Sequence, residues 1–188
     1  MLTIIMPATD LQKAQVMMEE VEAIFPGSQI IVSSNRQELG KGFAVREALK
    51  QATGEFICFL DGDGDISPKM IKRLIPYLVD YDIVVGVKPI SGLWSRRIIT
   101  YWSRLYIALL FGVKVSTQTG IKLFRRHTLT TWYSNGFLFD LEILCLAKKE
   151  GCTMIEVPIE CQTINKPMKF ISLWKTLKES WTLFLELK

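Results

Sequence analysis

The sequence lacks several patterns that would assign a function directly. It has a single histidine, His127, which excludes a metal site or a catalytic mechanism that needs two histidines. Its four cysteines show no Cys-x-x-Cys spacing and two of them lie inside apolar runs. We therefore expect reduced core residues rather than zinc ligands. No Gly-x-Gly-x-x-Gly or Walker motif is present, which argues against ordinary dinucleotide or P-loop chemistry.

Long hydrophobic runs are also missing, although 49% of the 188 residues are hydrophobic. The longest run, residues 98–113, is interrupted by Arg104, so we expect no spanning helix. The first residues have no basic segment, so we expect no signal peptide. The net charge of +4 is mild, and we expect no nucleic-acid partner. Together these absences favour one cytoplasmic domain with a substantial core.

The most informative stretch is the apolar run at residues 56–60, which leads directly into Asp61-Gly62-Asp63-Gly64-Asp65. Such a run is typical of a buried strand of a parallel sheet, and ligands bind at the carboxyl ends of such strands. Carboxylate oxygens there suit Mg²⁺ or Mn²⁺. A solvated Asp-Gly turn is the alternative. An EF-hand loop is excluded, because Ile66 and Lys72 stand where it requires Gly and Glu.

The first half of the chain alternates between strands and helices. The patterns predict strands at residues 2–6, 29–33, 56–60 and 82–87, and helices at residues 11–24, 41–52 and 68–79. Asp10 is a candidate N-cap and Pro76 is expected to kink or shorten its helix. Gly40-Lys41-Gly42 opens the second helix with backbone N–H groups suited to anions. The alternation predicts a Rossmann-like, doubly wound, mostly parallel α/β sheet flanked by helices.

The second half is richer in aromatic and basic residues. Residues 92–110 combine Trp, Tyr, Arg and Leu, and residues 136–144 predict a helix with Asp140 near its first turn. A last strand at residues 153–159 is expected at a sheet edge, because Pro158 has no N–H to donate. Residues 170–187 predict an amphipathic helix. Its apolar stripe either packs on the domain or lies at a membrane interface, and the basic aromatic segment favours the second.

Four motifs in order resemble family 2 glycosyltransferases of the GT-A fold, in the branch that makes polyprenyl- or dolichol-phosphate sugars. They are Gly40-Lys41-Gly42-Phe43-Ala44-Val45-Arg46, residues 59–65, residues 118–126 and residues 136–142. The resemblance implies a metal-dependent, inverting transfer of a hexose from a UDP- or GDP-sugar to a polyprenyl phosphate. This sequence departs from the family's pattern after the second strand, where an acidic residue and a helix-bearing stretch are missing.

The resemblance also implies roles for individual residues. Asp63 and Asp140 are the catalytic candidates, and Asp61, Asp63 and Asp65 the ligands of Mg²⁺ or Mn²⁺. The donor-binding set is Pro7, Ala8, Thr9, Ser34, Lys41, Asp61 and Asp63. The acceptor-phosphate set is Arg97, Arg104, Gln118, Arg125 and Arg126. The alternatives are a solvated basic face for these arginines and a helix N-terminal carboxylate for Asp140.

The predicted organisation is a GT-A domain at residues 1–165 and an amphipathic, membrane-interfacial helix at residues 166–188. The expected location is the cytoplasmic face of a membrane, with a homo-oligomer or a membrane partner subunit as further possibilities. Two other functions remain open. One is a non-catalytic nucleotide- or membrane-binding remnant of the family, and the other is a soluble transferase acting on a hydroxyl acceptor.

Overall fold

The computed structural model describes residues 1–34, 40–89, 94–117, 119–136, 138–161 and 170–187. Of residues 95–97 and 170–177 it describes the backbone alone. The strands are β1 Leu2–Ala8, β2 Gln29–Ser34, β3 Phe56–Leu60, β4 Ile83–Val87, β5 Ile121–Arg125 and β6 Met154–Pro158. The helices are α1 Leu11–Ile24, α2 Lys41–Gln51, α3 Lys69–Leu74, η1 Ile75–Val79, α4 Trp94–Phe111, η2 Arg126–Thr128, α5 Phe139–Lys149 and α6 Phe170–Leu187.

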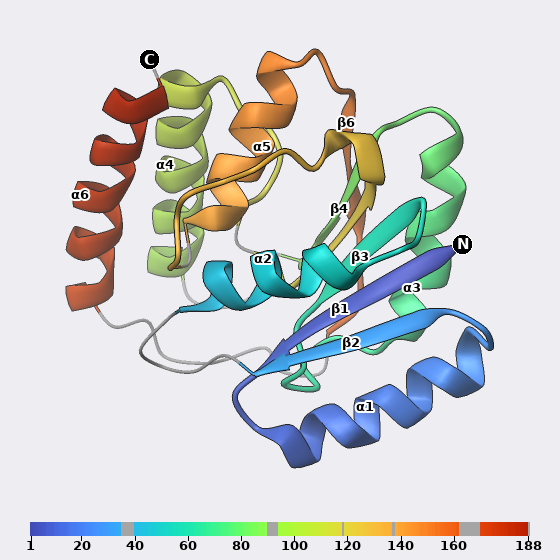
Figure 1. The fold of residues 1–188 in the computed structure, drawn as a ribbon. Helices are drawn as coiled ribbons and strands as arrows, with labels where there is room; N and C mark the ends of the chain where they lie inside the picture. The colour runs from blue at the N-terminus through green and yellow to red at the C-terminus, as the bar shows by residue number, and fades with distance from the viewer. Residues whose placement is uncertain (35–39, 90–93, 118, 137, 162–169, 188) are drawn as a thin grey trace.

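The strands form one sheet in the order β2-β1-β3-β5-β4-β6 (Figure 1). β1 pairs in parallel with β2 and β3, and β4 with β6, whereas β5 is antiparallel to both of its neighbours, β3 and β4. The predicted mostly parallel α/β sheet is therefore confirmed, and β5 is the strand that departs from the parallel direction. No strand was predicted at residues 121–125, which entered the sequence analysis only as part of a motif.

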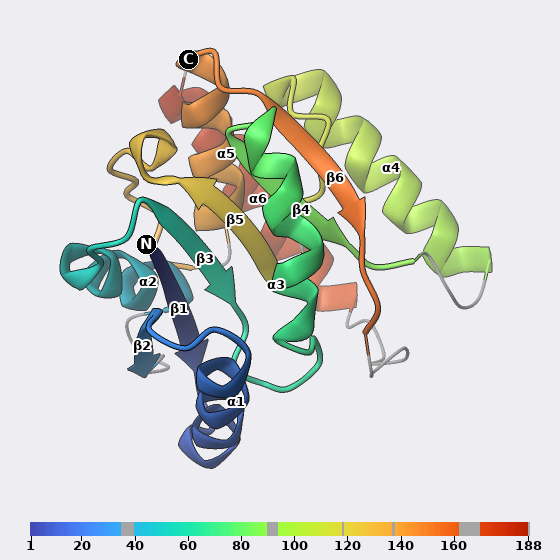
Figure 2. The same cartoon turned by 90° about the vertical axis from the view of Figure 1, so that its right-hand side faces the viewer.

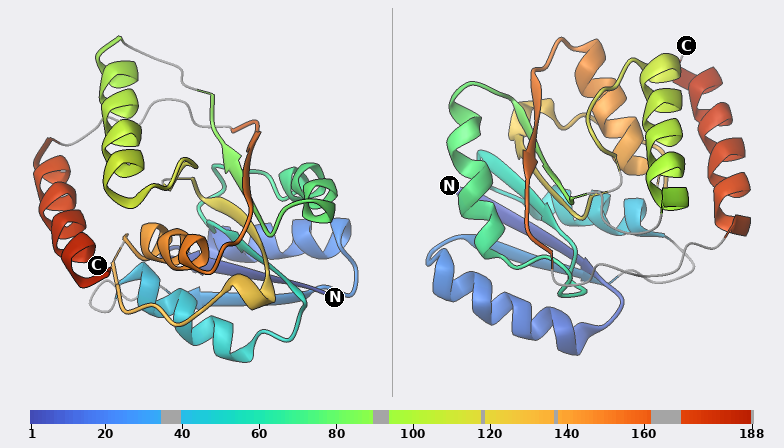
Figure 3. Two further views of the ribbon diagram at one scale, coloured as in Figure 1. Left: turned by 90° about the horizontal axis from the view of Figure 1, so that it is seen from above. Right: turned by 180° about the vertical axis from the view of Figure 1, so that it is seen from behind.

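Helices lie on both faces of the sheet (Figures 2 and 3). Each layer packs on the sheet through an apolar cluster. One face packs against α1, α3 and η1, through residues such as Met17, Val21 and Ile71. The other packs against α2 and α5, through residues such as Val45 and Leu144, and α4 and α6 extend this layer. This arrangement leaves the carboxyl ends of β1 and β3 at one end of the sheet, close to the start of α2.

Local sequence signals set several element boundaries as expected. The Asp10 side chain caps α1 by accepting hydrogen bonds from the backbone N–H groups of Gln12 and Lys13, at 3.0 and 3.3 Å. The helix predicted at residues 68–79 ends as an α-helix at Leu74 and continues as the 3₁₀ turn η1, which contains Pro76. β6 lies at a sheet edge, as Pro158 predicts.

The cysteines of the core also follow the prediction. All four are free, and Cys58 and Cys145 are buried. Burial raises the pKa of both thiols, that of Cys145 to about 12. A thiol with a raised pKa holds little thiolate near neutral pH, so these residues serve as packing groups.

Helix α6 both packs on the domain and faces outward. Leu183 is buried, and the ring of Phe184 meets that of Phe111 of α4 edge to face, with centroids 5.8 Å apart. Trp181 and Leu185 are 51% and 59% exposed. The predicted domain boundary at residues 165 and 166 lies outside the described residues. Among the helices that the structure describes, none has the length and hydropathy to cross a membrane.

Candidate functional site

The acidic turn after β3 lies where the sequence predicts it, at the carboxyl end of a central strand. The backbone N–H of Asp61 donates to the Gly120 carbonyl at 2.8 Å, and the N–H of Gly62 donates to the Pro7 carbonyl at 3.2 Å. A Cβ at Gly120 would overlap the Asp61 carboxylate, so this approach requires glycine. The segment before β5 and the end of β1 therefore fix the position of Asp61.

Lys41, at the start of α2, forms an ion pair with this turn. Its Nζ lies 2.5 Å from Oδ1 of Asp61 and 5.6 Å from the centroid of the Phe139 ring. Burial lowers the pKa of Lys41, but the nearby carboxylates of Asp61, Asp140 and Asp63 outweigh this effect, so its pKa is raised overall. Lys41 is therefore a fixed positive charge at the site.

A second lysine, Lys122 of β5, holds Asp140 of α5. Its Nζ lies 2.8 Å from Oδ1 of Asp140, and the two side chains are 2% and 12% exposed. The same ammonium donates to the backbone carbonyls of Thr119 and Thr117 at 2.7 and 3.3 Å. All three donors of Lys122 thus have an acceptor, which makes its burial tolerable.

The start of α2 is covered by residues 132–135. The N–H groups of Gly42 and Phe43 both donate to the Asn135 carbonyl, at 2.7 and 3.3 Å. A Cβ at either Gly40 or Gly42 would overlap the backbone of this segment. This corrects the prediction of an anion site at this helix start, because the Asn135 carbonyl already accepts two of the N–H groups. The glycines instead allow the backbone of residues 132–135 to pack closely against the helix.

Two charged side chains hold the same segment from its sides. The Arg46 guanidinium donates to the Trp132 carbonyl at 3.0 Å and to Oδ1 of Asn135 at 2.7 Å. The carboxylate of Glu142, which is 2% exposed, accepts the N–H groups of Tyr133 and Ser134 at 2.8 Å each. Arg46 and Glu142 belong to two of the motifs. They therefore position residues 132–135, which cover the start of α2.

The proposed metal ligands do not form a metal centre by themselves. The described residues contain no group of three or more His, Cys, Asp or Glu side chains that could hold a metal ion. Asp61 is paired with Lys41, and Oδ1 of Asp63 accepts the N–H of Asp65 at 3.2 Å. The oxygen donors are of the right chemical type, but their arrangement does not fit a metal as it stands.

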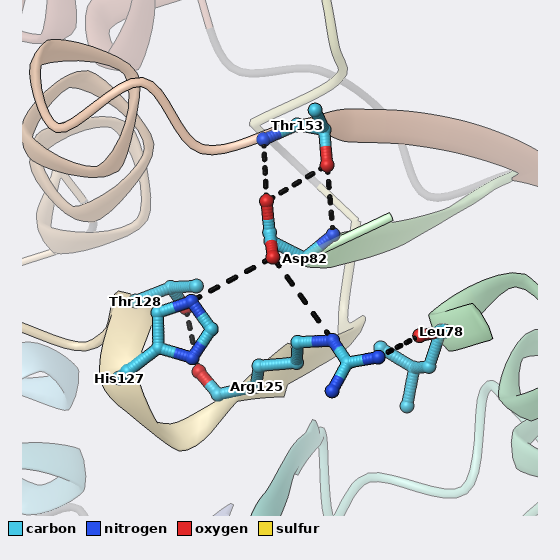
Figure 4. Close-up of polar contacts among 6 residues, drawn as sticks. All are labelled: Leu78, Asp82, Arg125, His127, Thr128 and Thr153. Atoms are coloured by element: carbon cyan, nitrogen blue, oxygen red, sulfur yellow. Dashed lines mark hydrogen bonds and ion pairs between the residues drawn. The ribbon is translucent and has the colours of Figure 1, made fainter. Parts of the chain in front are cut away.

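Arg125 and Arg126 lie at the opposite end of the sheet. Because β5 is antiparallel to β3, Ile121 pairs with Leu60 next to the acidic turn, and Arg125 pairs with Phe56 at the far end. Arg125 donates to the Leu78 carbonyl at 2.5 Å and lies 4.0 Å from Asp82 (Figure 4). Arg126 donates to the Ala52 carbonyl at 2.6 Å. The structure does not bring these two predicted acceptor-binding residues to the site.

The other predicted acceptor-binding residues fall into two groups. Arg104 of α4 donates to both carboxylate oxygens of Glu156 on β6, at 2.6 Å each. Glu156 also accepts the N–H of Ser116 at 2.5 Å. The pair of Arg104 and Glu156 therefore holds the segment before β5 in place. Gln118 and the side chain of Arg97 lie outside the described residues.

The predicted donor-binding residues line the same edge as the acidic turn. In the sheet register, Pro7 pairs with Ser33 and Ala8 with Ser34, at the carboxyl ends of β1 and β2. Thr9 follows them as an exposed residue. The structure thus brings together Pro7, Ala8, Ser34, Lys41 and Asp61 from four different elements.

Sequence reasoning missed Lys122, Arg46 and Glu142. A signal for Lys122 was available: a lone lysine inside the apolar run Ile121-Lys122-Leu123-Phe124 indicates a buried charge that needs a partner. Arg46 and Glu142 are the last residues of two of the motifs, but the motifs do not reveal the contacts that they make, because these depend on tertiary folding.

Comparison with known sequences places the chain among glycosyltransferases. Residues 13–135 match the family model described as "Glycosyl transferase family 2". The chain is 29% identical over 164 residues to a dolichyl-phosphate beta-glucosyltransferase of Dictyostelium discoideum, covering 74% of this chain and 48% of that protein. It is 30% identical over 165 residues to that of Drosophila melanogaster, covering 78% and 50%. The chain thus spans about half the length of these curated relatives.

Comparison with solved structures supports the fold. Glucosyl-3-phosphoglycerate synthase of Mycobacterium tuberculosis in complex with UDP aligns with a TM-score of 0.70 at 15% identity, over 99% of this chain and 79% of that one. The same enzyme in complex with Mn²⁺, UDP and glucosyl-3-phosphoglycerate aligns with a TM-score of 0.63 at 17% identity, over 98% and 78%. The predicted GT-A fold is confirmed, and the match over residues 13–135 shows that the chain belongs to glycosyl transferase family 2.

Proposed function

We propose that this chain transfers a hexose from a nucleotide-diphosphate sugar to a polyprenyl phosphate. The observation that carries the proposal is the alternation of charges at the carboxyl end of β3, where Lys41 pairs with Asp61 and Lys122 pairs with Asp140. The names of the relatives, which are dolichyl-phosphate beta-glucosyltransferases, support glucose as the hexose and a polyprenyl phosphate as the acceptor.

In the proposed reaction an acceptor phosphate oxygen attacks the anomeric carbon in line with the leaving diphosphate. The bond from the anomeric carbon to the donor diphosphate breaks, its electron pair stays on the diphosphate, and the configuration inverts. The acceptor phosphate is already an anion and needs little help from a base. Asp140 is held by Lys122 at 2.8 Å, which supports a role in orienting groups rather than in removing a proton.

The diphosphate gathers negative charge as the bond breaks, and the site must stabilise it. Lys41 is the described cation nearest to the acidic turn, and its charge is maintained by the surrounding carboxylates. Asp61 and Asp63 are the residues that would hold Mg²⁺ or Mn²⁺, with Asp65 beside them. For Asp61 to bind a metal, Lys41 must leave its carboxylate, and a donor diphosphate would give Lys41 a new partner.

We further propose that α4 and α6 rest on a membrane surface, on its cytoplasmic side. The apolar face of α4 is turned outward: Ile98, Tyr101, Trp102 and Leu109 are 52%, 64%, 62% and 76% exposed. Trp181 and Leu185 of the neighbouring helix α6 are also exposed. Aromatic and aliphatic side chains on one face of a helix are typical of interfacial binding. Arg97, one of the predicted acceptor-phosphate residues, lies on α4.

The test is a transfer assay with UDP- and GDP-sugars, short polyprenyl phosphates and Mn²⁺. The expected result is a sugar-phosphate lipid made by the wild type and lost by at least about a hundredfold in Asp63→Ala. Asp80→Ala removes an exposed carboxylate beyond η1 and should leave the rate unchanged. A wild type that forms no sugar-phosphate lipid, or an Asp63→Ala variant that forms it at the wild-type rate, contradicts the proposal.

Two alternatives predict different outcomes of the same assay. A non-catalytic remnant, which the short connection between β2 and α2 motivates, would bind UDP or liposomes without forming product. A transferase acting on a hydroxyl would consume donor with a sugar acceptor and would not associate with liposomes. Trp102→Glu on α4 separates these cases from the proposal, because it should weaken liposome binding without changing transfer to a water-soluble acceptor analogue.

A further inference from the structure

Strand β2 forms an open edge of the sheet. Its inner side pairs with β1, and no strand among the described residues pairs with its outer side. The strand Gln29-Ile30-Ile31-Val32-Ser33-Ser34 contains no charge and no proline, whereas the opposite edge strand β6 carries Glu156 and Pro158. Charges and prolines are what usually prevent an edge strand from pairing with another chain. β2 lacks this protection.

A cleft of about 300 Å³ runs beside this edge. One wall is formed by residues 31–34 of β2 and the other by a face of α2 that includes Phe43, Ala48 and Gln51. The hydroxyl of Ser33 is buried there and has no hydrogen-bond partner among the described residues. A buried hydroxyl without a partner costs free energy, so a polar group that reached the Ser33 hydroxyl would be stabilising.

We propose that a second copy of this chain fills the cleft by pairing its own β2 in the antiparallel direction, about a two-fold axis perpendicular to the sheet. Ile31 packs with the core on the α2 side, and Ile30 and Val32 pack with the core on the α1 side. Such an axis keeps each side chain on its own face, so one residue must lie opposite its own copy.

Centring the axis on Ile31 satisfies the buried hydroxyl. Gln29 of one copy then lies opposite Ser33 of the other. The Gln29 amide oxygen accepts from the Thr3 hydroxyl and the Thr53 N–H at 2.8 Å each, and the amide nitrogen donates to the Gln51 carbonyl at 2.9 Å. Of the polar groups of this side chain, the second N–H is the one left for the hydroxyl. Because β2 is uncharged, no like charges meet across the pair. This self-complementarity favours a second copy over a strand of another protein.

The size of the edge predicts a weak dimer. Two six-residue strands bury less than the roughly 1,200 Å² of a stable interface, so α1 and α2 of the two copies must contribute the rest. Leu11 and Val16 of α1 are each 59% exposed and are available for this. Association should therefore depend strongly on protein concentration.

Sedimentation velocity over a wide range of concentration tests the proposal, with Val32→Lys and Val32→Thr as matched variants. The wild type should dimerise, and Val32→Lys should raise the dissociation constant by about tenfold or more, because it places an ammonium group opposite the apolar Ile30 of the other copy and diagonal to the second introduced lysine. Val32→Thr, and Met154→Lys on β6, should change it little. A wild type that stays monomeric, or a folded Val32→Lys protein that dimerises as well as the wild type, overturns the proposal.

Oxidative cross-linking decides the case if Val32→Lys fails to fold. Ile31→Cys should form a disulfide-linked dimer, since residues facing their own copy in a sheet lie within the Cα separation that a disulfide allows. Val79→Cys on η1, where the wild-type side chain is 81% exposed and lies away from β2, reports random collisions. Equal cross-linking of the two variants, or cross-linking of neither, overturns the proposed register and the dimer with it. None of these measurements depends on transferase activity.

Discussion

The two ends of strand β5 carry similar charges into different surroundings. Near the acidic turn, Lys122 is 2% exposed and pairs with Asp140, next to the pair of Lys41 and Asp61. At the far end, Arg125 is 30% exposed and lies 4.0 Å from Asp82, which is joined to Thr153 and His127 (Figure 4). Both ends place cations beside carboxylates, but the pair of Lys122 and Asp140 is enclosed, whereas the side chains of Arg125 and His127 are 30% and 67% exposed.

This difference separates a candidate reaction site from a structural clamp. At the far end, Asp82 accepts hydrogen bonds from both the N–H and the hydroxyl of Thr153, at 2.8 Å each, and so ties the start of β4 to that of β6. Near the acidic turn, four charged side chains from four segments form two ion pairs, Lys41 with Asp61 and Lys122 with Asp140. Surface ion pairs contribute little free energy, whereas enclosed charges interact strongly with each other and with a charged ligand.

The largest expected effect is the loss of the Lys122 ammonium. Lys122→Met leaves the Asp140 carboxylate enclosed without its partner, which should lower the free energy of unfolding by about 3–5 kcal/mol. Chemical denaturation measures this. The double variant Lys122→Met with Asp140→Leu removes both charges and should recover a large part of the loss. If the single variant is as stable as the wild type, the pair is not enclosed as described, and the contrast between the two ends of β5 disappears.

An intermediate effect is expected at Lys41. Lys41→Met removes the cation from Asp61 and should weaken UDP binding by about tenfold, while Mn²⁺ added without nucleotide should bind more tightly. Isothermal titration with each ligand separately measures both changes. Lys50→Met on the same helix removes an exposed pair with Glu47 and serves as the control. Weaker Mn²⁺ binding in Lys41→Met would show that the lysine does not compete with metal for Asp61.

The smallest effect is expected at the clamp. Hydrogen bonds from the N–H and hydroxyl of Thr153, together with His127 and Arg125, hold the pKa of Asp82 below its ordinary value of 3.8. A depressed pKa gives stability that is present above the ordinary value and is lost as the pH falls through the folded-state pKa. Asp82→Asn should therefore lower stability at neutral pH by roughly 1 kcal/mol or less, and should flatten its decline in acid.

Thermal melts of the wild type and Asp82→Asn between neutral and acid pH check this sign. Transfer activity should be unaffected by the variant, because the clamp lies at the far end of β3 from the acidic turn. A drop in transfer rate at a temperature where the variant is fully folded would mean that the two ends of β5 are functionally coupled.

The sequence by itself determined the α/β class, most element boundaries and the position of the acidic turn. These features follow from local rules, because apolar runs specify buried strands, Asp10 caps a helix and Pro76 limits one. The four motifs were likewise readable in order along the chain, and the family follows from them.

Only the tertiary structure decided which motif residues meet. The direction of β5 has no local signal, since a five-residue strand can pair in either direction. That direction placed Lys122 at the site and removed Arg125 and Arg126 from it. The glycines at the start of α2 predicted an anion site locally. The Asn135 carbonyl, which is distant in the sequence, instead accepts the N–H groups of Gly42 and Phe43. A charge acquires its role from what surrounds it, and those surroundings are assembled from segments that the sequence does not place side by side.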